Sequence, residues 1–112
     1  MKYNGFNEIT VLVTGGTRGI GRAIAKAFLE QGAKVHVTGT KKNGNGPSGT
    51  IYHYCDFTNN QSLEHFCDSL RELNIEVLIN NAGINKIGAF TEFSPEDFLT
   101  VQQINIYSAF RL

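Results

Sequence analysis

The chain has 112 residues, and its ten Lys and Arg balance ten Asp and Glu. With 41% hydrophobic and 18% charged residues, it has the composition of one folded domain and not of a disordered chain. The neutral charge argues against a nucleic-acid binder or a polybasic membrane-surface protein, and no apolar run approaches the roughly 20 residues that span a bilayer.

The first forty residues predict a βαβ unit. Residues 9–14 are an apolar, β-branched run that ends in two glycines, and residues 34–38 form a second such run. Between them lies a helical pattern, which Gly32 ends. The apolar face of this helix is predicted to carry Ile20, Ala23, Ile24, Ala27 and Phe28. A strand, a helix and a strand in this order imply a parallel sheet.

Two more strands and a second helix follow. Residues 40–50 are rich in Gly, Asn and Pro and predict a loop, whereas residues 51–55 and 76–80 predict strands. Thr58 and Gln61 form a capping-box pattern at the start of the intervening helix. Its apolar stripe is predicted to contain Leu63, Phe66, Cys67, Leu70 and Leu73. The fourth strand is apolar at consecutive positions, as expected for a strand covered on both faces.

A last helix is predicted from residue 94 to the end of the chain, after a loop over residues 81–93. Ser94 is the N-cap, Pro95 follows at the first helical position, and two acids complete the first turn. Apolar residues cover most of the circumference of this helix, so we expect it to be buried on more than one side. No second domain is predicted within residues 1–112.

The two cysteines, Cys55 and Cys67, lack the spacing of a zinc site or a disulfide scaffold. We predict reduced, mostly buried thiols and no metal site. The first eight residues contain no hydrophobic stretch of a secretory signal, so a cytoplasmic protein is expected.

The glycine-rich segment 14–21 reads TGGTRGIG and lies between a predicted strand and a predicted helix. Gly15 allows the tight turn out of the strand, Gly19 leaves space where a pyrophosphate approaches the backbone, and Gly21 lets the helix pack closely on the strand. The free N–H groups and the positive end of the helix dipole then face the anion. In this context the motif predicts nucleotide binding rather than a plain turn.

Four elements in order make the chain resemble the N-terminal part of the short-chain dehydrogenase/reductase family. They are the TGGTRGIG turn, Asp56 after the third strand, Asn80-Asn81-Ala82-Gly83 after the fourth strand, and Asn105 in the last helix. The resemblance implies that Asp56 holds the adenine ring and that Asn105 belongs to the family's Asn-Ser-Tyr-Lys tetrad. Taken singly, the same residues have structural roles: a turn acid, bridges between backbone groups at a strand end, and a polar residue in an apolar helix.

The resemblance also implies the fold and the full set of site residues. The fold is a partial Rossmann (doubly wound) α/β fold, with parallel strands in the order 3-2-1-4, helices on both faces and the C-terminal half absent. The implied catalytic residue is Asn105. The implied cofactor-binding residues are Gly15, Thr17, Arg18, Gly19, Ile20, Gly21, Thr40, Lys41, Asp56, Phe57, Asn81, Ala82 and Gly83.

The end of the second strand favours NADP(H) over NAD(H). An acid at this point binds the ribose 2′-hydroxyl, whereas a base accommodates a 2′-phosphate. No acid occurs from residue 35 to residue 48, and Gly39 falls where NAD-preferring family members carry Asp. Arg18 and Lys41 are predicted to surround the 2′-phosphate, and Lys42 reads as a solvated loop charge.

The family's Ser and Tyr-x-x-x-Lys have no counterpart in this chain. The residues four positions after its tyrosines are Asn7, Asp56, Thr58 and Arg111. An Arg does not replace the Lys, because its guanidinium stays protonated. The family reaction is hydride transfer between a nicotinamide and a carbonyl or alcohol substrate. Loss of the general acid lowers such a rate by about 10²–10⁴-fold, so we expect little turnover from this chain alone.

Two functional hypotheses stay open. In the first, the chain is the NADP(H)-binding portion of a reductase. In the second, it is a non-catalytic nucleotide-binding or assembly module that associates through its open sheet edge and its last helix. Both hypotheses are compatible with a homo-oligomer, which we expect.

Overall fold

Four parallel strands form one sheet in the order β3-β2-β1-β4, which confirms the predicted topology. The computed structural model describes residues 5–83, 92 and 94–112, so most of the predicted loop over residues 81–93 lies outside the described residues. The strands are β1 (Thr10–Val13), β2 (Lys34–Gly39), β3 (Ile51–Tyr54) and β4 (Val77–Ile79). In the sheet register, Val11 lies between Val35 and Val77.

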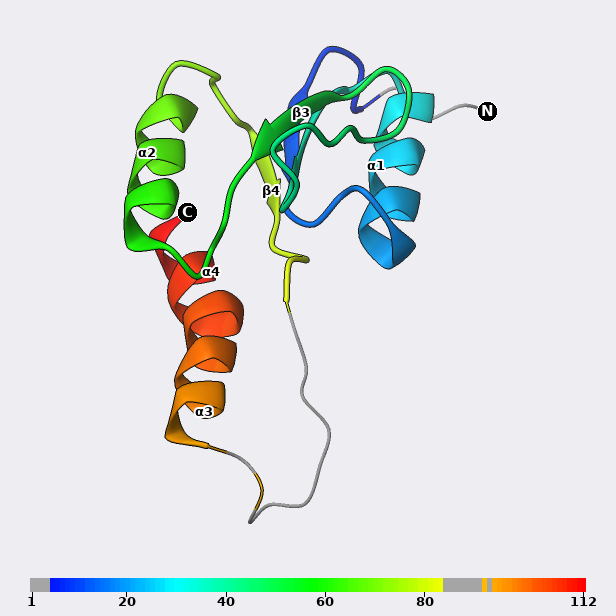
Figure 1. The fold of residues 1–112 in the computed structure, drawn as a ribbon. Helices are drawn as coiled ribbons and strands as arrows, with labels where there is room; N and C mark the ends of the chain where they lie inside the picture. The colour runs from blue at the N-terminus through cyan, green and yellow to red at the C-terminus, as the bar shows by residue number, and fades with distance from the viewer. Residues whose placement is uncertain (1–4, 84–91, 93) are drawn as a thin grey trace.

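Helices cover both faces of the sheet, as predicted (Figure 1). On one face, α1 (Gly19–Glu30) packs against valines of β1 and β2. On the other face, α2 (Asn60–Leu70) and the last helix pack around Leu12 and Leu63. Alternate residues of a strand point to opposite faces, so Val11 and Val13 enter the first core and Leu12 enters the second.

The buried face of α1 differs from the predicted stripe. Gly21 and Ala25 are buried, whereas Ile20 is 75% exposed and Ala23 and Ala27 are also exposed. The two small residues let the helix approach the sheet closely, and this contact sets its rotation. The prediction that Ile20 and these alanines face the core was therefore wrong, whereas Ile24 and Phe28 do pack against it.

The N-terminus of α2 also differs from the prediction. Asn59 is the N-cap, and its side chain accepts a hydrogen bond from the Ser62 N–H at 2.9 Å. Thr58 lies one residue before the cap, where its N–H and its hydroxyl both donate to Asp56 Oδ1, at 3.0 and 2.5 Å. These two bonds hold Thr58 in the turn that precedes the helix, and the predicted capping box at Thr58 was therefore wrong. The helix ends at Leu70, so Leu73 lies beyond it.

The last helix consists of α3 (Pro95–Gln102), the π-helical turn η2 (Gln103–Tyr107) and α4 (Ser108–Arg111). The predicted start is confirmed, because Ser94 and Asp97 form a reciprocal capping box. The π turn was not predicted. Among residues 5–83, 92 and 94–112, the second core covers one side of this helix, through Ile104 and Leu112. Its exposed large apolar residues are Phe98, Leu99, Ile106, Tyr107 and Phe110.

Candidate functional site

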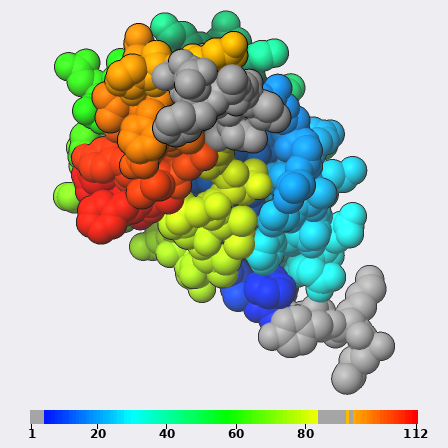
Figure 2. All heavy atoms as spheres, turned by 90° about the horizontal axis from the view of Figure 1, so that it is seen from below, coloured from blue at the N-terminus to red at the C-terminus, as the bar shows by residue number. Residues whose placement is uncertain are grey.

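The predicted cofactor residues lie at the carboxyl edge of the sheet. The register places the ends of the four parallel strands side by side, and a predicted segment follows each strand. Figure 2 views the molecule from this side, where the chain after β4 lies between α1 with its preceding turn and the last helix. The topology therefore brings together residues that are up to 90 positions apart in the chain, from Gly15 to Asn105.

A buried threonine joins the turn after β1 to the segment after β4. Thr14 is 1% exposed, and its Oγ1 accepts the backbone N–H groups of Asn81 at 3.0 Å and Ala82 at 2.9 Å. In return, Asn81 Nδ2 donates to the carbonyls of Thr14 at 3.1 Å and Gly15 at 3.2 Å. The bridging role that the sequence allowed for the asparagines is confirmed for Asn81. Thr14 was not among the predicted site residues, although a threonine that ends an apolar strand was a signal for it.

Thr38 at the end of β2 holds the same turn from the other side. The Gly15 N–H donates to Thr38 Oγ1 at 3.0 Å, and the Gly16 N–H donates to the Thr38 carbonyl at 3.2 Å. Thr38 was also missed as a site residue. Side chains and carbonyls from β1, β2 and the segment after β4 therefore fix the backbone of the glycine turn.

The glycines of the turn are required by its geometry. Gly15 and Gly19 have φ values of +65° and +58°, which side chains rarely adopt. A Cβ atom on Gly21 would lie 2.1 Å from the Gly15 carbonyl oxygen and 2.4 Å from Asn81 Nδ2. A Cβ on Gly19, by contrast, would meet nothing within 4 Å, so this side of the turn is open.

The N-terminus of α1 fits an anion. Its N-cap residue, Arg18, makes no side-chain capping bond, and the first turn of the helix contains no acid. Among the residues that the structure describes, the N–H groups of this turn have no side-chain cap, and they lie beside the open position at Gly19. Ile20, Arg18 and Gly19 are all exposed, so they line the accessible surface of the turn.

The end of β2 has no room for a side chain at Gly39. A Cβ there would lie 2.6 Å from the Tyr52 ring and 2.9 Å from Thr17 Cγ2. The Tyr52 hydroxyl also donates to the Lys41 carbonyl at 2.5 Å and thereby holds the following loop. The Thr40 and Lys41 residues themselves are exposed.

Asp56 lies in the turn after β3, where its own N–H donates to Ser62 Oγ at 3.0 Å. It lines a cleft of about 660 Å³ between β3 and α2, whose walls also include His53, His65 and Lys42. Phe57, next in the chain, is buried in the second core. Asp56, the predicted adenine contact, is therefore accessible, whereas the side chain of Phe57 belongs to the core.

Two histidines form a pair on the sheet face below α2. His36 is 2% exposed, and its Nδ1 lies 2.8 Å from His53 Nε2. Burial lowers the pKa of both imidazoles, and the nearby charges of His53 and Lys34 lower the pKa of His36 further. Within the described residues His36 Nε2 has no hydrogen-bond partner. Both rings are thus neutral near pH 7, and neither histidine was among the predicted site residues.

Asn105 lies within the π turn η2 and is exposed. Its Oδ1 lies 3.1 Å from the position that a Cβ on Gly83 would occupy. The helix therefore brings Asn105 against the backbone of the segment after β4, at the same edge as the glycine turn.

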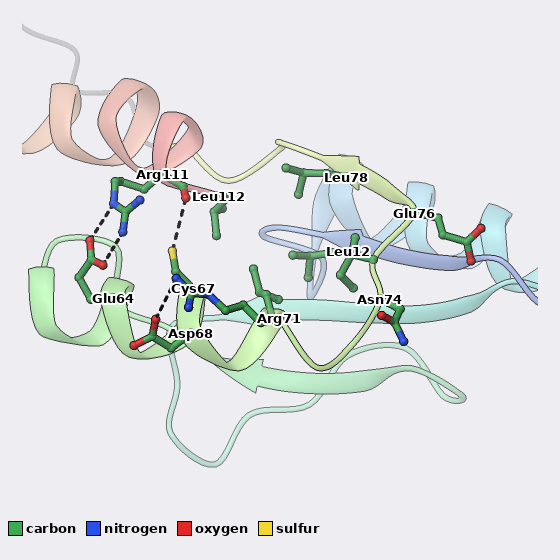
Figure 3. A pocket seen from close by; sticks show the side chains of 12 residues that line it. Leu12, Glu64, Cys67, Asp68, Arg71, Asn74, Glu76, Leu78, Arg111 and Leu112 are labelled. Carbon is green, nitrogen blue, oxygen red and sulfur yellow. Dashed lines mark hydrogen bonds and ion pairs between the residues drawn. The ribbon is translucent and has the colours of Figure 1, made fainter.

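A separate cleft of about 570 Å³ lies between α2, β4 and α4 (Figure 3). Arg111 Nε donates to Glu64 Oε1 at 2.7 Å across it, and this contact lowers the pKa of the Glu64 carboxyl. The Cys67 thiol donates to the Arg111 carbonyl at 3.6 Å. Burial raises the pKa of Cys67, and it raises that of Cys55 to about 11, so both free thiols stay protonated at neutral pH. None of the predicted cofactor residues lines this cleft.

In the part of the chain that the structure describes, no group of three or more His, Cys, Asp or Glu side chains is arranged to hold a metal ion. Across the same residues, no helix has the length and apolar character needed to cross a membrane.

Comparison with known proteins gives consistent matches. The family model described as short chain dehydrogenase matches residues 9–112. The chain is 37% identical over 109 residues to the 3-oxoacyl-[acyl-carrier-protein] reductase MabA of Mycobacterium avium, covering 96% of this chain and 42% of MabA. The ligand-free aldohexose dehydrogenase of Thermoplasma acidophilum superposes with a TM-score of 0.84 at 28% identity, covering 98% of this chain and 43% of that one.

A short chain dehydrogenase from Leptospira borgpetersenii, solved with bound NAD+, gives a TM-score of 0.82 at 26% identity, covering 95% of this chain and 43% of that one. The chain thus spans about two fifths of the length of the proteins that it matches.

Proposed function

Because this chain belongs to the short-chain dehydrogenase family, we propose that its carboxyl edge binds a nicotinamide dinucleotide and that it forms the cofactor-binding portion of a reductase. One observation carries the proposal: the glycine turn is held open and rigid by Thr14, Thr38 and Asn81, beside an uncapped helix N-terminus. Such a turn presents backbone N–H groups to a pyrophosphate without reorganisation.

The remaining residues take roles around that anchor. Thr17, Arg18, Gly19 and the exposed Ile20 would line the pyrophosphate and the adjoining ribose. Asp56, which faces the cleft beside β3, would contact the adenine. The backbone of residues 81–83, next to Asn105, would lie along the ribose and nicotinamide.

NADP(H) is the preferred cofactor in this proposal. β2 ends in Gly39 instead of an acid that would repel a 2′-phosphate, and the side chains of Tyr52 and Thr17 fill the space around this glycine. Arg18 and Lys41 are exposed and carry the positive charge that a 2′-phosphate requires. The Leptospira relative was solved with NAD+, so NADH is the competing ligand that a test must include.

The proposed reaction is that of a carbonyl reductase or alcohol dehydrogenase. A bound nicotinamide supplies or accepts the hydride. Asn105 is the one member of the family's tetrad that the resemblance places in this chain, and its proximity to Gly83 suits a role beside the nicotinamide. The proton-transferring Tyr and Lys have no counterpart among its residues, so the 112-residue chain is expected to bind cofactor with little turnover.

Assembly is a second candidate function, favoured by one observation. Five large apolar side chains on the last helix are exposed, and Phe110 is 82% exposed. An exposed apolar face of this kind is typical of an interface, and a homo-oligomer would cover it.

Calorimetric titration of the chain with NADPH and with NADH tests the proposal. We expect saturable binding that favours NADPH, and a loss of that preference in Arg18→Ala. The matched control is Arg71→Ala, because Arg71 lies after α2 and lines the cleft that contains no cofactor residue. A folded chain that binds neither dinucleotide would refute the proposed function and leave the assembly hypothesis.

A further inference from the structure

The π turn η2 changes which side chains of the last helix share a side. In a regular α-helix, residues five positions apart lie about 140° apart around the axis. In the π turn, the Ser108 N–H donates to the carbonyl of Gln103, five residues earlier. This bond brings the two residues nearly above one another, which an α-helical turn would not do.

Both residues then reach the same acceptor. Gln103 Nε2 donates to the Phe57 carbonyl at 3.2 Å and to Asn60 Oδ1 at 3.1 Å. The Ser108 hydroxyl lies 3.3 Å from the Phe57 carbonyl and 2.8 Å from the Gln103 carbonyl, so it can donate to either. Ser108 is 1% exposed and Phe57 is 7% exposed, so water cannot replace these donors freely.

The shared acceptor explains why a π turn persists here. Its hydrogen-bond geometry is poorer than that of an α-helix, and such turns occur mostly where another interaction supports them, frequently at functional sites. The support comes from the turn between β3 and α2, 46 and 51 residues away in the chain. Asp56 immediately precedes Phe57, so the same turn also carries the predicted adenine contact.

Asn105 lies in the middle of the π turn, between the two anchoring residues. Its Oδ1 lies 3.1 Å from the position that a Cβ on Gly83 would occupy, so the side chain lies beside that glycine. A return to α-helical geometry would remove the extra residue from this turn and rotate Asn105 relative to α4.

We propose that Gln103 is a positioning residue: with Ser108 it fastens the π turn to the Phe57 carbonyl and thereby directs Asn105 toward Gly83. The significance of Asn105 for the reaction rests on the proposed function, whereas the fastening is a property of the chain without cofactor. Gln103 does not touch the reacting atoms, and it acts through the orientation of the helix.

The test is amide NMR of the full chain without cofactor. Gln103→Met removes the donor and keeps an unbranched side chain, and Ser108→Ala removes the hydroxyl. Gln102→Met is the matched control, since Gln102 is the exposed neighbour on the same helix. We expect Gln103→Met to move the side-chain amide signal of Asn105 and the backbone amide signal of Gly83, and Gln102→Met to leave both in place.

The double variant adds a second readout. Either single variant leaves the Phe57 carbonyl with one donor, so the Ser108 amide should exchange its hydrogen only slightly faster. Loss of both donors should accelerate this exchange by about tenfold, which is more than the product of the two single effects. If Gln103 and Ser108 contributed only local packing, their two substitutions would change the exchange rate of the Ser108 amide independently of each other.

Unchanged Asn105 and Gly83 signals in Gln103→Met would overturn the proposal. So would exchange rates in the double variant that equal the product of the single effects. If the double variant does not fold, the Asn105 and Gly83 signals of Gln103→Met alone decide whether Gln103 positions Asn105. A separate titration with NADPH distinguishes failure of the proposed function from failure of the anchoring. A chain that binds no dinucleotide refutes the proposed function, and the NMR result still confirms or refutes the anchoring of the π turn.

Discussion

The hydroxyl of Thr14 is expected to stabilise the site more than any exposed polar group at the sheet edge. Thr14→Val keeps the shape of the side chain and removes the acceptor of the Asn81 and Ala82 N–H groups. Each buried N–H group without a partner costs about 1–3 kcal/mol. The added methyl group offsets about 1 kcal/mol of this loss. For the two N–H groups together, we therefore expect the free energy of unfolding to fall by about 1–5 kcal/mol.

Urea unfolding at neutral pH measures this change, with Thr14→Ser as the control. The serine keeps the hydroxyl and loses one methyl group, so it should cost about 1 kcal/mol. The slope of the unfolding free energy against urea should stay constant in both variants, because the buried surface is unchanged. If Thr14→Val were as stable as the unmodified chain, or more stable than Thr14→Ser, then the hydroxyl would not join the two segments as we describe.

Three further changes test other parts of the site. Gly21→Ala places a methyl group 2.1 Å from the backbone of the glycine turn, so the unfolding free energy should fall by about 3 kcal/mol, and calorimetry should show weaker NADPH binding. His36, which is buried, and His53, which is half-buried, have pKa values below the ordinary value of about 6.5. Near and below about pH 6.5, the unfolded chain therefore binds more protons than the folded chain. The free energy of unfolding should be at its full value above about pH 6.5 and decline as the pH falls below it, with a shallower decline in His36→Leu. Urea titrations at pH 7.5 and 5.5 measure this difference, and an equal loss of unfolding free energy in both proteins would contradict the assignment. Gly39→Asp should destabilise the chain and should not transfer the preference to NADH, because the Tyr52 ring occupies the space; tight NADH binding by this variant would show that the position is open.

Local sequence patterns were sufficient to predict the topology. The runs at residues 9–14, 34–38, 51–55 and 76–80 all became strands, and the connections between them imposed a parallel sheet. The glycine spacing of the turn was equally informative, because φ values and close backbone approaches are local requirements that only glycine meets. These features depend on neighbours within a few residues, so a sequence pattern can record them.

The errors arose where contacts outside the helical pattern decided which residues face the core or cap a helix. Ile20 was assigned to the core, but the close packing of Gly21 on the glycine turn rotated the helix. Thr58 was assigned as a cap, but it donates to Asp56 in the preceding turn and Asn59 is the cap. Neither outcome follows from helical periodicity or from a capping pattern, because each is decided by a competing partner.

From its own sequence the chain determines four parallel strands, their order and the glycine turn at their carboxyl edge, because periodicity and glycine spacing act over short distances. Only the tertiary structure decided how that edge is held together. The hydroxyls of Thr14 and Thr38 bind segments that lie 23 to 68 residues away, and the Phe57 carbonyl supports a π turn about 50 residues later. Burial makes these hydrogen bonds strong, because each donor and acceptor has been removed from water. No local sequence pattern specifies which distant group will pair with a given donor or acceptor.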